Sequence, residues 1–251
     1  MTLLGVIAVP ALGWFIADWS GATTLAVYWF ETVAGCLFIA ARILLHRRWN
    51  PRRGHFDYNA ANTNRLSGQS MSFLSGFLLV SLAFSAAHGL FLGAILFLLN
   101  HNDVGELAHI DWGSVGIACL SVLAFLAVDF LVDLSTLGTW SFWQMEQTGN
   151  HALSRVIVVH LTLLLGFLGV ALTGAADAFF GVFVALKSMA ALSHVVPQWD
   201  PATAPKWLSG VMNRVPNVRP GETFEDFWAK DRAAETSRRA KNEQPWDQRC
   251  R

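Results

Sequence analysis

Ionisable side chains recur inside long apolar runs of the sequence, where an unpaired charge would be costly. They are Glu31, His88, Asp129, Asp133, His160, Lys187 and His194. Imidazoles and carboxylates are ligands for zinc and iron, and both groups can also relay protons. What these side chains can do therefore depends on which elements hold them and on whether those elements bring them together.

The elements around these residues are long apolar segments, each near the ~20 residues that a helix needs to cross a bilayer. They run roughly over residues 3–19, 22–45, 73–99, 113–137, 155–174 and 176–196. The composition agrees, because the 251 residues are 53% hydrophobic and only 14% charged. The sequence therefore predicts an all-α fold, a polytopic integral membrane helical bundle of about six transmembrane helices.

Lysine and arginine are distributed unevenly between the loops. They follow the second segment, open the fifth and recur after Pro197, whereas the stretches around 20, 100–112 and 172–176 contain none. Because cytoplasmic loops carry the excess of these residues, both termini are predicted to be cytoplasmic, in a bacterial inner or plasma membrane. The expected partner is the lipid bilayer, with a homo-oligomer as a further expectation. A formal net charge of zero argues against nucleic acid.

The composition changes after the last apolar segment. We expect a transmembrane domain over 1–196 and a polar cytoplasmic tail over 197–251, partly helical or disordered. Thr223 and Asp226 have the spacing of a capping box, which predicts a short surface helix, with a solvated tail as the alternative. Trp140 and Trp143 indicate an interfacial segment over 138–154.

Helical spacing sorts the ionisable residues into two layers at ~1.5 Å per residue. Glu31, His88 and Lys187 fall near the midplane, where Glu31 and Lys187 are predicted to form an ion pair with His88 as a hydrogen-bond partner. Ser81, Ser85 and His88 share one helical face. The cytoplasmic layer is predicted to hold a zinc or iron ion with ligands from Asp129, Asp133, His160 and His194.

Three classes of function remain open at this point. The polar cluster could bind a metal ion or haem, as in a lipid-acting enzyme. It could serve a proton-coupled or small-solute transporter, or it could only fix helix packing in a structural or assembly protein. Whether the chain is an enzyme is left open, because no standard hydrolase or nucleotide motif is present. Gly89, Gly93 and Gly166 are predicted to be close-packing sites.

Four stretches carry a resemblance to a known family: "YWFET", "AHGLF", "SRVIVVHLTLLLG" and "LKSMAALSH". They resemble a family of bacterial and archaeal multi-pass membrane proteins catalogued only as a domain of unknown function. Its motifs match at Glu31, His160, Lys187 and His194. The resemblance implies a membrane location and no known activity. The cluster is also similar to the serine, aspartate and paired-histidine sites of alkaline ceramidase-like and progestin-receptor-like hydrolases, although their closing His-x-x-x-His is absent.

Overall fold

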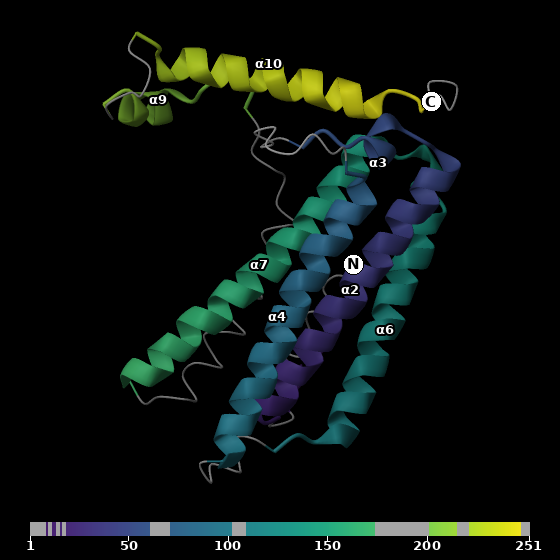
Figure 1. Cartoon of the computed structure of the whole chain (residues 1–251), viewed down its shortest axis with the longest axis vertical. Coiled ribbons are helices and arrows are strands. Elements are labelled where there is room, and N and C mark those ends of the chain that lie inside the picture. The colour runs from purple at the N-terminus through teal and green to yellow at the C-terminus, as the bar shows by residue number, and fades with distance from the viewer. Residues whose placement is uncertain are drawn as a thin grey trace. The chain divides into compact units, whose positions relative to one another are not determined.

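The structure, a computed structural model, describes residues 9, 12–13, 16, 19–60, 71–101, 109–173, 201–214 and 221–246. In these ranges the chain forms helices and no strand, as predicted. The helices are α2 (Gly21–Trp49), α3 (Arg53–Phe56), α4 (Phe73–His101), α6 (Trp112–Leu134), the 3-10 helix η1 (Leu137–Thr139), α7 (Phe142–Thr173), α9 (Lys206–Met212) and α10 (Phe224–Glu243) (Figure 1).

The chain divides into two compact units. The first, which we call the bundle, comprises Met1–Asn50 and Leu74–Val195 and holds α2, α6, α7 and nearly all of α4. The second, which we call the polar unit, comprises Pro51–Phe73 and Val196–Arg251 and holds α3, α9 and α10. The polar unit thus combines two stretches that are far apart in the sequence.

Three described helices of the bundle are long and apolar enough to cross a membrane, namely Gly21–Trp49, Phe73–Ala94 and Trp112–Leu134. These helices confirm the second, third and fourth predicted segments, and they support a membrane protein. Most of the first predicted segment and all of the sixth from residue 176 lie outside the described residues.

The fifth predicted segment needs a correction, because α7 begins at Phe142 and not near residue 155. Its first turns belong to residues 138–154, for which Trp140 and Trp143 predict an interfacial segment, and polar residues interrupt the apolar pattern there. These turns nevertheless bury Phe142 and Met145, which are 1% and 0% exposed. Packing of this apolar stripe extends the helix well before the continuous apolar run starts.

Two helices of the bundle start side by side. Ser20 caps α2 by accepting a hydrogen bond from the Thr23 amide, and its hydroxyl donates to the His109 carbonyl at 2.6 Å. Asp111 caps α6 by accepting from the Gly113 amide, and its own amide donates to the Thr23 hydroxyl at 3.1 Å. Hydrogen bonding by Ser114 lowers the pKa of the Asp111 carboxyl, which suits the positive end of a helix.

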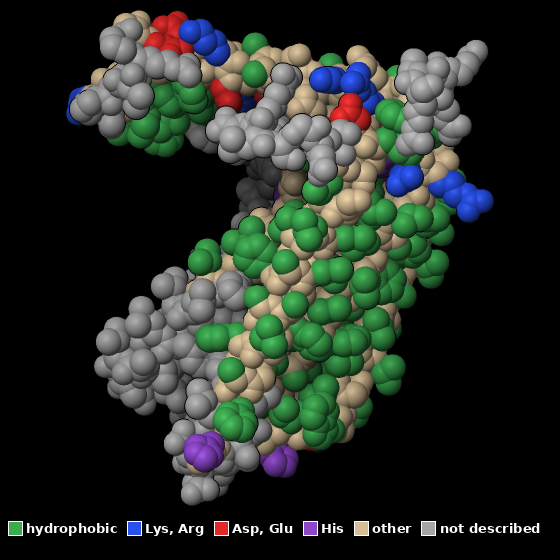
Figure 2. Space-filling model, viewed as in Figure 1, with side chains coloured by type: hydrophobic (Ala, Val, Ile, Leu, Met, Phe, Trp, Pro, Cys, Tyr) green, Lys and Arg blue, Asp and Glu red, His purple; other side chains and the backbone are tan. Residues whose placement is uncertain are grey.

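The central helix of the described bundle is α2. Half of the apolar 18-residue stretch of α2 is buried by protein, whereas only 11% of the equivalent stretch of α6 is buried. It contacts α6 and α7 directly, and its Trp29 bonds to α4. The outer surfaces of α4 and α6 are apolar instead, with Leu90 77% exposed and Ile117 71% exposed. Figure 2 shows hydrophobic side chains covering the face of the bundle that is turned to the viewer. Such surfaces suit contact with lipid.

The polar unit is held together by the contact of residues 51–60 with α10. Arg52 forms an isolated antiparallel bridge with Pro245, and the Arg53 amide donates to the Gln244 carbonyl at 2.8 Å. The rings of Phe56 and Trp246 stack with centroids 4.6 Å apart. These contacts form a small folded interface between segments that lie about 190 residues apart in sequence.

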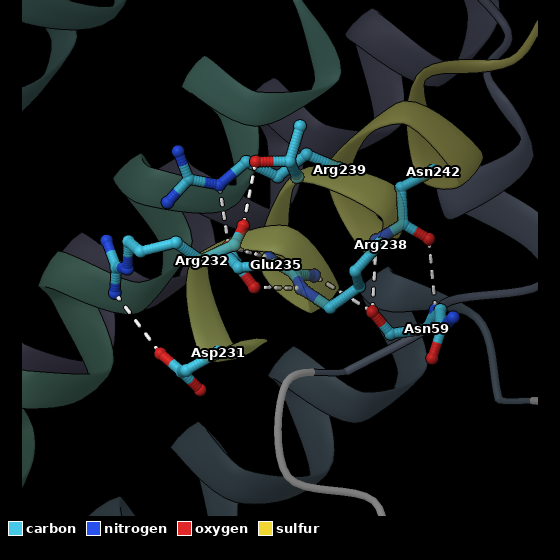
Figure 3. A network of polar contacts seen from close by, with 8 residues as sticks. Asn59, Asp231, Arg232, Glu235, Arg238, Arg239 and Asn242 are labelled. Carbon is cyan, nitrogen blue, oxygen red and sulfur yellow. Dashed lines mark hydrogen bonds and ion pairs between the residues drawn. The ribbon is translucent and has the colours of Figure 1, made fainter. Parts of the chain in front are cut away.

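Four residues complete this interface, and we call Asn59, Glu235, Arg238 and Asn242 the clasp (Figure 3). The Asn59 carbonyl accepts from Arg238 at 2.8 Å and from Asn242 at 3.0 Å. The Asn59 amide donates to Asn242 at 3.1 Å. Glu235 receives both a bidentate contact from Arg238 and a third bond from Arg239. The hydrogen bond from Arg238, with a further one from Arg239, lowers the pKa of Glu235 to about 2.

The capping box at the start of α10 is confirmed. The Thr223 hydroxyl accepts from the Asp226 amide, and the Asp226 carboxylate accepts from the Thr223 amide. The helix that follows runs over 20 residues, Phe224–Glu243. Its start is joined to the end of α9 by Asn213, whose side chain accepts from the Phe224 amide and donates to Glu225.

Candidate functional site

A buried arginine joins α2 to α6. The Nη2 atom of Arg42 lies 2.9 Å from Oδ2 of Asp129 and 2.9 Å from Oδ2 of Asp133. The aspartates are four residues apart, so both project from one face of α6. The Arg42 guanidinium also lies 5.5 Å from the centroid of the Phe130 ring, which itself packs edge-on against Phe38. We call Arg42, Asp129 and Asp133 the ion cluster.

The ion cluster fixes α2 against α6. The Arg42 side chain is only 5% exposed, whereas those of Asp129 and Asp133 are 42% and 29% exposed. A buried guanidinium left without a carboxylate destabilises a protein by about 3–5 kcal/mol. The cluster also carries one more negative than positive charge. A cation would be attracted by this surplus, but Arg42 already stands between the two carboxylate oxygens that a divalent metal would use.

A second set of buried polar side chains is divided between α2 and α4. On α2, Tyr28 and Glu31 are buried, at 2% and 9% exposed. On α4, the predicted face of Ser81, Ser85 and His88 is confirmed, because all three side chains are 3% exposed or less. We call these five residues the polar layer. It places ionisable and hydroxyl groups inside protein and away from the apolar outer surface.

The register of the polar layer is set by Trp29. Its indole nitrogen donates to the Ser85 backbone carbonyl at 2.9 Å. A Cβ atom added at Gly89 would come within 3.0 Å of that nitrogen, so the glycine lets the indole lie against α4. Gly89 is therefore confirmed as a close-packing site. A Cβ added at Gly93 would meet no atom of the described residues within 4 Å, so close packing is not seen there in that part of the chain.

The two groups lie at different depths along α2. Glu31 is ten residues beyond Gly21, which corresponds to ~15 Å of helix, or about half of the hydrocarbon thickness. Arg42 lies eleven residues further on, or ~16 Å deeper, near the end of the helix that contacts Trp140. At that end His46 and Asn50 both bond to the Trp140 carbonyl, at 2.9 Å and 3.1 Å.

His160 belongs to the second half of α7. Trp140 ties the beginning of α7 to the end of α2, and His160 lies 18 residues beyond Phe142, or ~27 Å along the helix. Its predicted place at the depth of Asp129 and Asp133 stays a prediction. The C-terminal half of α7 also diverges from α2 (Figure 1).

Several predicted site residues lie outside the described residues. They are Lys187, His194 and the side chain of His160. Within the ranges that the structure covers, no group of three or more histidine, cysteine, aspartate or glutamate side chains is placed to hold a metal ion. The four-residue metal site and the pairing of Glu31 with Lys187 therefore stay predictions.

Three buried ionisable residues were not recognised as parts of a site. Arg42 was read only as a marker of orientation, because it ends an apolar run. His46 and Glu146, at 0% and 2% exposed, lie near the Trp140 end of the bundle. A signal for Arg42 did exist: two aspartates one turn apart in α6 require a cation, and α6 supplies none.

Comparison with known proteins gives one match. A family model described as "Family of unknown function (DUF6498)" matches residues 1–206, which cover the bundle and the beginning of α9. No curated protein and no solved structure matches the chain.

Proposed function

The chain belongs to the DUF6498 family of unknown function, and we propose that it is a proton-linked membrane transporter. The observation that carries this proposal is Glu31, a carboxyl group 9% exposed, ten residues beyond the start of a helix that is apolar enough to span a membrane. Ionisable groups at such depth mark proton relays and substrate pathways in membrane proteins. The coupled solute is left undefined.

The chemistry of the polar layer suits proton exchange. Glu31 supplies a carboxyl group and His88 an imidazole, which are side-chain types that form proton relays in membrane proteins. Ser81 and Ser85 add hydroxyl groups, which can both donate and accept hydrogen bonds. Tyr28, one turn before Glu31 on the same helix, adds another.

The ion cluster would have a mechanical role in this proposal. Arg42 faces two carboxylates, so it can keep one partner while contact with the other is lost. Movement of α2 against α6 could then proceed without leaving a buried guanidinium unpaired, which is the costly state. We expect the six-span topology with both termini in the cytoplasm, which puts the polar layer near the midplane and the ion cluster towards the cytoplasm.

Proton flux into proteoliposomes tests the proposal. A potassium diffusion potential set by valinomycin would drive protons inward, and a dye in the lumen would report its pH. Wild-type protein should acidify the lumen faster than empty liposomes do, and Glu31→Gln should abolish the difference. Asp231→Asn, which alters an exposed carboxylate of α10, is the matched control and should keep wild-type flux. Equal flux in wild-type and Glu31→Gln vesicles would refute the proposal.

The predicted pairing of Glu31 with Lys187 has its own test. Glu31→Gln and Lys187→Met should each lower thermal stability in detergent, because each leaves the other group buried without its counter-charge. If the groups interact, the double variant should recover part of the loss. Strict additivity of the two single effects would show that they do not.

A metal site of a lipid-acting enzyme is the second candidate. The observation favouring it is the partial exposure of Asp129 and Asp133, which leaves carboxylate surface available beside Arg42. Protein purified without chelator should then contain zinc or iron. That metal should be lost in His160→Ala and His194→Ala and retained in the control His101→Ala. Protein without metal and without haem absorbance would eliminate this candidate. If proton flux is absent as well, the polar groups serve helix packing.

A further inference from the structure

The described part of the polar unit has an exposed apolar surface. Four large side chains on α9 and α10 contribute to it: Trp207, Val211, Met212 and Phe227, which are 66%, 51%, 39% and 51% exposed. Trp207 and Val211 are four residues apart on one face of α9. Figure 2 shows hydrophobic side chains gathered at the α9 end of the polar unit. We call these four residues the apolar patch.

The composition of the apolar patch is that of a membrane-surface element. Tryptophan is enriched at the boundary between lipid and water because its ring is apolar and its N–H is polar. Charged residues of both signs border the patch, with Lys206 beside Trp207, Arg214 after Met212, and Glu225 and Asp226 directly before Phe227. Apolar side chains with a charged border are typical of helices that lie at the surface of a bilayer.

Chain connectivity keeps the polar unit close to a bilayer. Residues 51–72 connect two helices that could span a membrane, since α2 ends at Trp49 and α4 begins at Phe73. The same segment holds α10, because the Trp246 amide donates to the Pro51 carbonyl at 3.2 Å and the clasp binds Asn59. The end of α10 is therefore anchored two residues from the end of a spanning helix.

We propose that the apolar patch inserts into the lipid–water interface of the membrane that the bundle spans, so that α9 and the start of α10 form a peripheral anchor. The tether to a helix that could span a membrane, and the exposed tryptophan, favour lipid over a second copy of the chain as the occupant. The proposal does not depend on proton transport, because none of its residues belongs to the polar layer or to the ion cluster.

Spin labels on the full-length protein test the anchor in nanodiscs containing anionic lipid. Cysteines would be placed at Val211, Phe227 and Ala229 in a variant without native cysteines whose thermal unfolding matches wild type. Ala229 is the matched control, because it is two residues from Phe227 and on the opposite face of α10. For each label, the accessibility to oxygen is divided by the accessibility to a water-soluble nickel complex. This ratio should be severalfold higher for the labels at 211 and 227 than for the label at 229.

A second variant keeps the test decisive. Trp207→Glu combined with Met212→Glu charges two exposed sites, so the polar unit should fold normally, and access of the nickel complex to the label at Phe227 should rise. Two results would overturn the proposal. One is equal nickel access at 211, 227 and 229, which would put the patch in water. The other is strong dipolar coupling between patch labels on separate chains, which would show that a second copy covers it.

Discussion

Nη2 of Arg42 lies 2.9 Å from Oδ2 of Asp129, although 87 residues separate the two in the sequence. The same nitrogen lies 2.9 Å from Asp133. One donor group therefore bridges two carboxylates, which makes the aspartates partly redundant and the arginine irreplaceable. This asymmetry can be measured.

Arg42→Met should destabilise the bundle by about 3–5 kcal/mol, because it leaves two neighbouring carboxylates without their counter-charge. Asp129→Asn and Asp133→Asn should each cost less, since the other aspartate still pairs with the guanidinium. The double aspartate variant should approach the loss seen for Arg42→Met. Unfolding by SDS in mixed micelles, followed by tryptophan fluorescence, would measure these differences. A double variant as stable as wild type would show that the ion pairs contribute nothing.

Gly89→Ala should destabilise the contact between α2 and α4 by about 1–3 kcal/mol, the usual cost of overpacking. The new methyl group would lie 3.0 Å from the Trp29 indole nitrogen and would displace it from the Ser85 carbonyl. The control is Gly93→Ala on the same helix, where the methyl group meets nothing within 4 Å. It should be neutral or stabilising, since alanine favours helix by ~1 kcal/mol over glycine. Equal losses for both variants would contradict the contact.

Acid should open the clasp. The folded-state pKa of Glu235 is about 2, below its usual 4.5, so its contribution to stability is fully present above pH 4.5 and is lost as the pH falls towards 2. The protection factor of the Asn59 amide against hydrogen exchange should therefore fall over this pH window. In Glu235→Gln this protection factor should already be lower at neutral pH, and its further fall over the window should be smaller. An acid response unchanged by the substitution would assign the effect to another group.

Fusions of a reporter that is active only outside the cytoplasm test the orientation. The reporter should stay silent after Arg251 and should be active when inserted near Asn102, because basic residues are absent around that loop. Activity of the fusion after Arg251 would reverse the orientation and move the ion cluster to the opposite side of the membrane.

Features of this fold with a local cause could be predicted from the sequence. The face of Ser81, Ser85 and His88 follows from spacing within one helix, and α10 follows from the capping box at Thr223 and Asp226. The start of α7 at Phe142 could not be placed, because the apolar stripe that extends it is supported by packing and is interrupted by polar residues.

Long-range partners could not be identified in the same way. Asp129 and Asp133 signalled the need for a cation, but nothing near them in the sequence distinguished Arg42 from a metal held by histidines. The clasp is similar, since Asn59 carries no sign that it will bind residues 179 and 183 positions later. Such contacts are determined by tertiary packing, which one sequence alone does not encode in a readable pattern.

The bridge between Arg52 and Pro245 has a consequence for biosynthesis. Arg52 bonds to a carbonyl 191 positions later, and a ribosome adding roughly 5–20 residues per second needs roughly 10–40 s to reach that partner. Residues 51–60 therefore stay unfolded until their partner has been synthesised, which happens only after the hydrophobic segments between them have left the ribosome. A nascent chain stopped before residue 243 would have all of those segments and an open polar unit. The polar unit can therefore close only after translation has passed α10. A cellular protease that cleaves the open polar unit would degrade chains that stop before this helix and spare chains that contain it.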